Sequence, residues 1–169
     1  MTWTIVVAVL CTILVAFAGG ALTKLDDWYF GLRFPSWKPP DWAFGPTWSV
    51  ILGSACYGAV LGWDNAPTPH ERTVIVILFA ANGVLNALWS FLHFTCRRPD
   101  WAMLEVGLLQ STNVALCWYL YDISHVASYC MVPYVVWVVY AGALNAAVVL
   151  MNWPFGRKAE AAATAQRAD

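Results

Sequence analysis

Nearly all charged side chains of this sequence lie in short stretches between or after five long apolar runs. The runs are 1–23, 42–63, 73–96, 101–121 and 123–156. Four of them contain no Asp, Glu, Lys or Arg, and the fourth along the chain contains a single acid, Glu105. A helix needs about 20 mostly apolar residues to cross the hydrocarbon core of a bilayer, so each run is long enough to span it. The pattern predicts an all-α membrane protein, a bundle of five transmembrane helices.

Composition supports the membrane class. Only 11% of the residues are charged, whereas soluble domains carry about 25%. We predict one transmembrane domain over 1–156 and a cytoplasmic, disordered tail over 157–169. The predicted spans are about 4–23, 43–63, 73–95, 101–120 and 126–151.

The basic residues predict the orientation in the membrane. Five spans place the two termini on opposite sides, and eight of the nine Lys and Arg residues fall on the side of the C-terminus. The exception is Arg72. Because cytoplasmic loops carry the excess of Lys and Arg, we expect a cytoplasmic C-terminus and an N-terminus outside.

Several functional classes find no support in the sequence. A net charge of −1 gives no electrostatic footprint for nucleic acid. The five cysteines form no CxxC pair, and most lie in apolar runs, where a free thiol behaves as a small hydrophobic group. The sequence has no P-loop, GxGxxG or HExxH motif. We therefore assign no catalytic residue, expect no metal or cofactor, and interpret Glu105 as structural.

The connection after the first run is unusually rich in aromatic residues and prolines. Pro35, Pro39 and Pro40 each fix φ, so the segment can be stiff with few hydrogen bonds. Trp and Tyr favour the membrane interface, which accounts for some of these residues. A preference for the interface does not explain the Trp37-Lys38-Pro39-Pro40 pattern. That pattern favours an ordered first loop that acts as a lid over the cytoplasmic mouth of the bundle.

Polar and aromatic residues share one face of the third run. Asn82, Asn86, Trp89 and His93 are spaced 4, 3 and 4 residues apart, which places them along one side of a helix. Two interpretations stay open: the amides hydrogen-bond between helices, or the face forms the wall of a cavity. For His93 a hydrogen-bonded interior role is favoured over ligand binding.

The fifth run repeats this arrangement. Tyr134, Trp137, Ala141 and Asn145 are spaced 3, 4 and 4 apart, and a large aromatic residue followed one turn later by a small one makes a slot for a flat ligand. Together with Trp48, which opens the second run, they predict a pocket lined by indoles. Such a pocket suits a large planar apolar molecule. The Gly58-xxx-Gly62 pair permits close helix approach, either within the chain or at the seam of a dimer.

The motifs resemble those of one known family. The pattern WYxxLxxPxWxPPxWxFGPxW over 28–48, Asn82-xxx-Asn86-xx-Trp89, and Pro133-Tyr134-xx-Trp137 followed by Leu144-Asn145 resemble the TspO/translocator (peripheral benzodiazepine receptor-like) family. The resemblance covers residues 5–153. It implies that the pocket between the five helices, closed by the first loop, binds porphyrins such as protoporphyrin IX. It also implies a homodimer in a bacterial membrane, or in the mitochondrial outer membrane if the source is eukaryotic.

Motif match and spacing together give a set of ligand-binding residues. They are Tyr29, Trp37, Pro40, Trp48, Asn82, Asn86, Trp89, Trp137, Ala141 and Asn145.

Sterol binding is the weaker implication. Ala146 and Ala147 follow Leu144-Asn145, where animal members of the family carry an aromatic-basic motif.

Three functions are therefore considered: a carrier or store for porphyrin-like ligands, a sensor whose lid presents an altered face to a partner, and light-dependent porphyrin breakdown at the indoles. The first is favoured.

Overall fold

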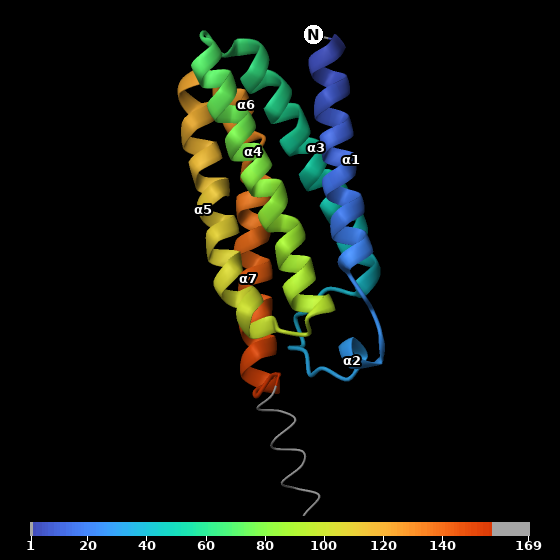
Figure 1. Cartoon of the computed structure of the whole chain (residues 1–169). Coiled ribbons are helices and arrows are strands. Elements are labelled where there is room, and N and C mark those ends of the chain that lie inside the picture. Colours follow the sequence, from blue (N-terminus) through green and yellow to red (C-terminus); the bar gives the residue numbers. More distant parts are fainter. Residues whose placement is uncertain (1, 157–169) are drawn as a thin grey trace, which may run out of the picture.

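The computed structural model describes residues 2–156, and the predicted tail at 157–169 lies outside the described residues. Within that range every regular element is a helix, and the long helices run side by side (Figure 1). The elements are α1 (Thr2–Leu22), α2 (Asp27–Phe30), α3 (Asp41–Asn65), α4 (Pro69–Ser90), the π-helix η1 (Phe91–Thr95), α5 (Pro99–Ile123), α6 (His125–Tyr129) and α7 (Val132–Asn152).

The predicted all-α membrane bundle is confirmed. Four stretches are long and apolar enough to cross a bilayer, namely Thr2–Leu22, Asp41–Asn65, Pro69–Thr95 and His125–Asn152. The remaining long helix, α5, has 25 residues. Its apolar character is reduced by Glu105, Gln110 and Asn113. Because α5 packs between α4 and α7, its polar side chains can face the interior of the bundle rather than lipid.

The predicted spans differ from the structure at two places. The fifth predicted span is broken by a turn at residues 130–131, which separates α6 from α7. Pro133 stands in the first turn of α7, where a missing N–H does not interrupt the helix. The third span ends in the π-helix η1, where the backbone of Cys96 donates to Phe91 O five residues earlier.

Close packing between α3 and α6 depends on Gly58. A Cβ atom at Gly58 would lie 3.0 Å from the carbonyl oxygen of Ala127 and 3.1 Å from Cys130 Cβ. One turn later, a Cβ at Gly62 would meet the Leu120 side chain of α5. The predicted close approach of helices at this glycine pair is thus an approach of α3 to α5 and α6.

This packing gives a prediction with an internal control on the same helix. We expect Gly58→Ala to lower the free energy of unfolding by about 1–3 kcal/mol, because the added methyl group overpacks the contact with α6. Gly53→Ala should instead stabilise α3 slightly, since nothing lies within 4 Å of its added Cβ and alanine is the better helix former. Thermal unfolding in detergent measures both, and equal shifts would contradict the packing argument.

The first loop, residues 23–40, is ordered and crosses the end of the bundle at which α3 begins and α7 ends (Figure 1). We call it the lid. Its centre is Tyr29, which is buried among the rings of Phe34 and Phe94. The Tyr29 hydroxyl donates to Asp41 Oδ1 at 2.6 Å, and Lys38 Nζ lies 2.5 Å from the same oxygen. Burial and the hydrogen bond to Asp41 raise the pKa of Tyr29 above its ordinary value.

Two further contacts attach the lid to distant elements. Arg97 Nη2 lies 2.7 Å from Asp26 Oδ2, and the hydrogen bond lowers the pKa of Asp26 below its ordinary value. The backbone N–H of Arg33 donates to Asn152 Oδ1 at 2.8 Å, and Asn152 Nδ2 donates back to Arg33 O at 2.9 Å. The lid is therefore held by α3, by the connection between η1 and α5, and by the last turn of α7.

Candidate functional site

Four side chains from three helices meet inside the bundle and form what we call the inner cluster: Trp48, Asn86, Tyr134 and Trp137. Tyr134 is at its centre, with only 1% of its surface exposed. Asn86 Nδ2 of α4 donates to the Tyr134 hydroxyl at 2.8 Å. The indole of Trp48 packs edge-on against Tyr134, with ring centroids 5.7 Å apart. Tyr134 thus joins Asn86 of α4 to Trp48 of α3, and Trp137 contacts this group through Trp48.

Trp137 connects the inner cluster to the surface of α7. Its indole lies edge-on to Trp48 at 6.4 Å and to Phe44 at 5.7 Å, and it stacks on Tyr140 at 5.4 Å. Within the described residues its Nε1 atom is buried without a hydrogen-bond partner. A buried N–H that lacks an acceptor is energetically unfavourable, so a rotation of the indole that exposed Nε1 to a ligand oxygen would be favoured.

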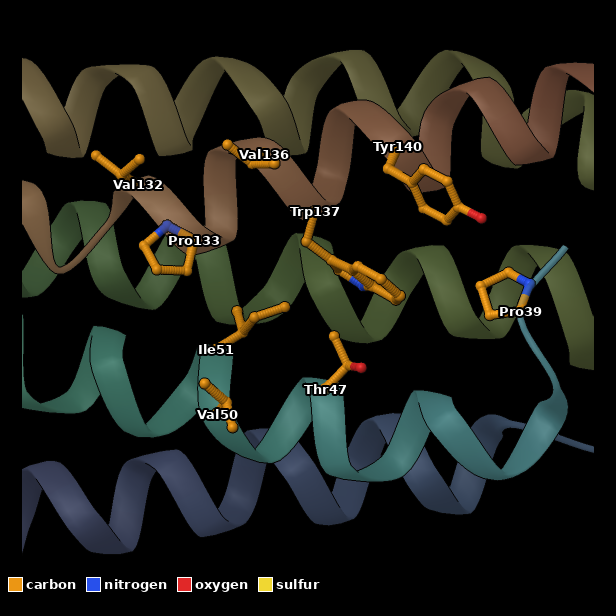
Figure 2. Close-up of a pocket in the computed structure, with 9 residues that line it drawn as sticks. All are labelled: Pro39, Thr47, Val50, Ile51, Val132, Pro133, Val136, Trp137 and Tyr140. Atoms are coloured by element: carbon orange, nitrogen blue, oxygen red, sulfur yellow. The ribbon is translucent and has the colours of Figure 1, made fainter. Parts of the chain in front are cut away.

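A groove of about 660 Å³ runs between α3 and α7 beside Trp137 (Figure 2). Val50 and Val136 at its rim are 69% and 62% exposed, so the groove opens sideways, toward lipid. We call it the lateral groove. Its lining residues are Pro39, Thr47, Val50, Ile51, Val132, Pro133, Val136, Trp137 and Tyr140.

Helix periodicity accounts for both walls of the lateral groove. Thr47 and Ile51 are one turn apart on α3, and Val136 and Tyr140 are one turn apart on α7. The lid contributes Pro39 at one end. Nearby, the Tyr140 hydroxyl donates to the Trp37 carbonyl at 2.9 Å, and the two rings lie 5.5 Å apart. The lid thus borders the lateral groove at one end.

Two of the expected ligand-binding amides are hydrogen-bonded to α5. Asn82 Nδ2 donates to Thr112 Oγ1 at 2.9 Å and to Asn113 Oδ1 at 2.8 Å. Asn145 Nδ2 donates to the Pro99 carbonyl at 3.0 Å. Two interpretations were open for the polar face of α4, namely hydrogen bonds between helices or the wall of a cavity. Asn82 makes the hydrogen bonds between helices.

The remaining expected residues lie at the lid end of the bundle. Trp89 packs against His93 and Phe94, with ring centroids 5.0 and 5.8 Å apart, and Phe94 in turn contacts Tyr29 of the lid. Pro40 is exposed directly before α3.

Ala141 is half-buried, one turn after Trp137 on α7.

Five residues at the site were not among the ligand-binding residues that the sequence predicted. They are Phe44, Thr47, Ile51, Tyr134 and Tyr140. The spacing could have indicated Phe44 and Ile51, since they lie 4 residues before and 3 residues after Trp48 and so share its helix face. Tyr134 belonged to the polar-aromatic face of the fifth run but was not assigned to ligand binding. Nothing in the spacing indicated that its hydroxyl accepts from Asn86.

Comparison with known proteins gives a consistent result. The model of the TspO/MBR family matches residues 7–151. The chain is 31% identical to the Translocator protein of Homo sapiens over 134 residues, which cover 78% of this chain and 79% of the relative. It is 32% identical to the Tryptophan-rich protein TspO of Archaeoglobus fulgidus over 153 residues, or 88% and 96% of the two chains. Protein CrtK of Rhodobacter capsulatus is 35% identical over 138 residues, or 80% and 84%.

Proposed function

The chain belongs to the TspO/MBR family of membrane proteins, and from that membership we propose that it takes a porphyrin-like tetrapyrrole from the bilayer into the lateral groove. Trp137 is the proposed stacking surface. The proposed role is transport or sequestration of the ligand, with the lid facing the cytoplasm.

The observation that carries the proposal is the lateral groove with an indole in its wall. Its volume of about 660 Å³ lies in the range of about 300–1,000 Å³ usual for small-molecule sites. Its lining is almost wholly apolar, and a flat aromatic ligand gains both area burial and ring stacking there. Because the groove opens toward lipid, a ligand dissolved in the bilayer reaches it without passing the lid.

Polar recognition in this proposal comes from two groups. The unpartnered Nε1 of Trp137 is covered in this structure, and once the indole turns toward the lateral groove it can donate to a carboxylate or carbonyl oxygen of the ligand. The second group is the Asn86 amide, which donates to the Tyr134 hydroxyl. A ligand that displaces Tyr134 from Asn86 would gain a second donor.

The test is a titration of the purified protein with protoporphyrin IX in the dark, followed by Trp fluorescence. We expect saturable quenching in the native protein and a dissociation constant about 3- to 10-fold higher in Trp137→Phe, because the smaller ring loses stacking area. Asn86→Ala should also weaken binding. Trp118→Phe is the matched control, since Trp118 of α5 is 77% exposed. Equal dissociation constants in Trp137→Phe and Trp118→Phe would place the ligand outside the lateral groove.

The contact between Trp48 and Trp137 favours one second function, light-dependent oxidative breakdown of the bound porphyrin by dioxygen. Trp137 lines the lateral groove, and the Trp48 indole packs edge-on against it with ring centroids 6.4 Å apart. An illuminated sample would then develop a new absorbing product that Trp137→Phe does not form. Saturable binding with an unchanged spectrum under light would instead support transport or sequestration.

The cytoplasmic lid and the homodimer stay predictions. Protease access to the lid in sealed membranes of known orientation tests the first. The mass of the detergent-solubilised particle tests the second.

A further inference from the structure

A second groove lies at the end of the bundle opposite the lid, where α3 ends and α4 begins. Its volume is about 430 Å³. We call it the distal groove. Its lining residues are Trp63, Pro69, Arg72, Thr73, Val76 and Ile77. It shares no lining residue with the lateral groove, so a ligand can occupy it independently of the proposed porphyrin site.

The distal groove holds one cation, and that cation is uncompensated. The Arg72 guanidinium lies over the Trp63 ring, 5.6 Å from its centroid. Among residues 2–156 Arg72 takes part in no ion pair, and its Nε atom is buried without a hydrogen-bond partner. A guanidinium presents five donors and stays charged, so an unpaired one at a groove calls for an anion.

The acids nearest in sequence are already engaged elsewhere. Glu71 forms the capping box of α4, where its carboxylate accepts from the backbone N–H of Thr68 and contacts the Thr68 hydroxyl. Asp64 accepts a hydrogen bond from Thr4 of α1 at 3.1 Å. Neither carboxylate lines the distal groove. The charge of Arg72 therefore faces the groove without a protein counter-ion in the described chain.

Beyond Arg72 and Thr73, the lining on α4 is apolar and follows the helix toward the middle of the bilayer. Val76 lies one turn beyond Arg72 on α4, Ile77 follows it, and both are exposed. Trp63 is an aromatic residue of the kind found at headgroup level. The distal groove thus has a cation and an indole together near the helix ends and an apolar wall one turn further along α4, as a phosphate and an acyl chain are placed in a membrane lipid.

We propose that the distal groove binds a glycerophospholipid with a net anionic headgroup, such as phosphatidylglycerol. The phosphodiester pairs with Arg72, and one acyl chain lies along Val76 and Ile77. A free anion would use only Arg72 and leave the apolar wall empty. A diacylglycerol, which carries no phosphate, would use only the wall and leave the guanidinium unpaired. An anionic phospholipid satisfies both parts of the distal groove.

The experiment measures lipid binding to the full-length, delipidated protein in detergent by native mass spectrometry. Three probes separate the sources of affinity: dioleoylphosphatidylglycerol, dioleoylglycerol with the same chains and no phosphate, and glycerol 3-phosphate with no chains. The variants are Arg72→Gln, Arg72→Lys and, as a matched control, Arg33→Gln. Arg33 is exposed at the lid end, and its hydrogen bonds to Asn152 use the backbone alone.

We expect one phosphatidylglycerol to bind the native protein and Arg33→Gln equally, and to bind Arg72→Gln about fivefold more weakly, as the loss of one basic residue at a membrane surface predicts. Arg72→Lys should restore most of the affinity. Equal binding to Arg72→Gln and Arg33→Gln would overturn the proposal. So would dioleoylglycerol binding as tightly as the phospholipid, or glycerol 3-phosphate competing with it at equal concentration. Circular dichroism establishes that each variant is folded.

Discussion

Replacing Tyr134 by alanine is expected to lower the free energy of unfolding by about 3–5 kcal/mol, the range found when a buried aromatic side chain is truncated. Tyr134 is almost fully buried, and it contacts both Trp48 of α3 and Asn86 of α4. The truncation leaves a cavity and also removes the acceptor of the Asn86 amide. Thermal or denaturant unfolding in detergent measures the loss.

The conservative variant separates packing from hydrogen bonding. Tyr134→Phe keeps the ring and removes only the hydroxyl, so we expect a loss of about 1 kcal/mol. Because this change frees Asn86 Nδ2, it should also leave porphyrin binding intact or strengthen it. A loss in Tyr134→Phe as large as that in Tyr134→Ala would mean that the hydrogen bond, and not the packing, holds the inner cluster together.

The second large effect is expected at Asn82. Asn82→Leu removes both hydrogen bonds to α5 and leaves Asn113, which is fully buried, without a partner for its Oδ1. Burying an unsatisfied polar group costs about 1–3 kcal/mol, and Asn113 Nδ2 already lacks a partner among the described residues. We therefore expect Asn82→Leu to lower the free energy of unfolding by about 2–3 kcal/mol.

The double variant provides the control. Replacing both partners by apolar residues of similar size can be nearly neutral, so Asn82→Leu/Asn113→Leu should regain most of the stability lost in the single variant. The same unfolding measurement applies. If the double variant is less stable than Asn82→Leu alone, then Asn113 makes a stabilising contact that does not involve Asn82.

The spans were predictable because bilayer thickness and the cost of burying charge act on composition alone. The turn between α6 and α7 was not, since no charge marks it and the apolar run continues through residues 130–131. The π-helix at the end of α4 could not be predicted from the sequence for the same reason. The turns of a π-helix are wider than those of an α-helix. The direction of the His93 side chain therefore differs from the one that the 4, 3 and 4 spacing predicts for a regular α-helix.

At the site, spacing predicted which residues share a face of one helix but not which helix that face meets. Asn82 and Asn86 lie one turn apart, yet the first bonds to Asn113 on α5 and the second to Tyr134 on α7. The lateral groove was unforeseen for a similar reason. It lies between α3 and α7, whose Trp48 and Trp137 are in edge-on contact, whereas the sequence indicated a pocket topped by the lid.

The attachment of the lid to Asn152 has a consequence for how the protein is made. Arg33 and Asn152 are 119 residues apart, so the first loop leaves the ribosome long before its last anchor is synthesised. Until α7 has entered the membrane, the loop has its partners on α3 and beside η1 but none on the final helix. Biogenesis therefore leaves the mouth of the bundle incompletely covered through most of translation, and the last turn of the last helix completes it.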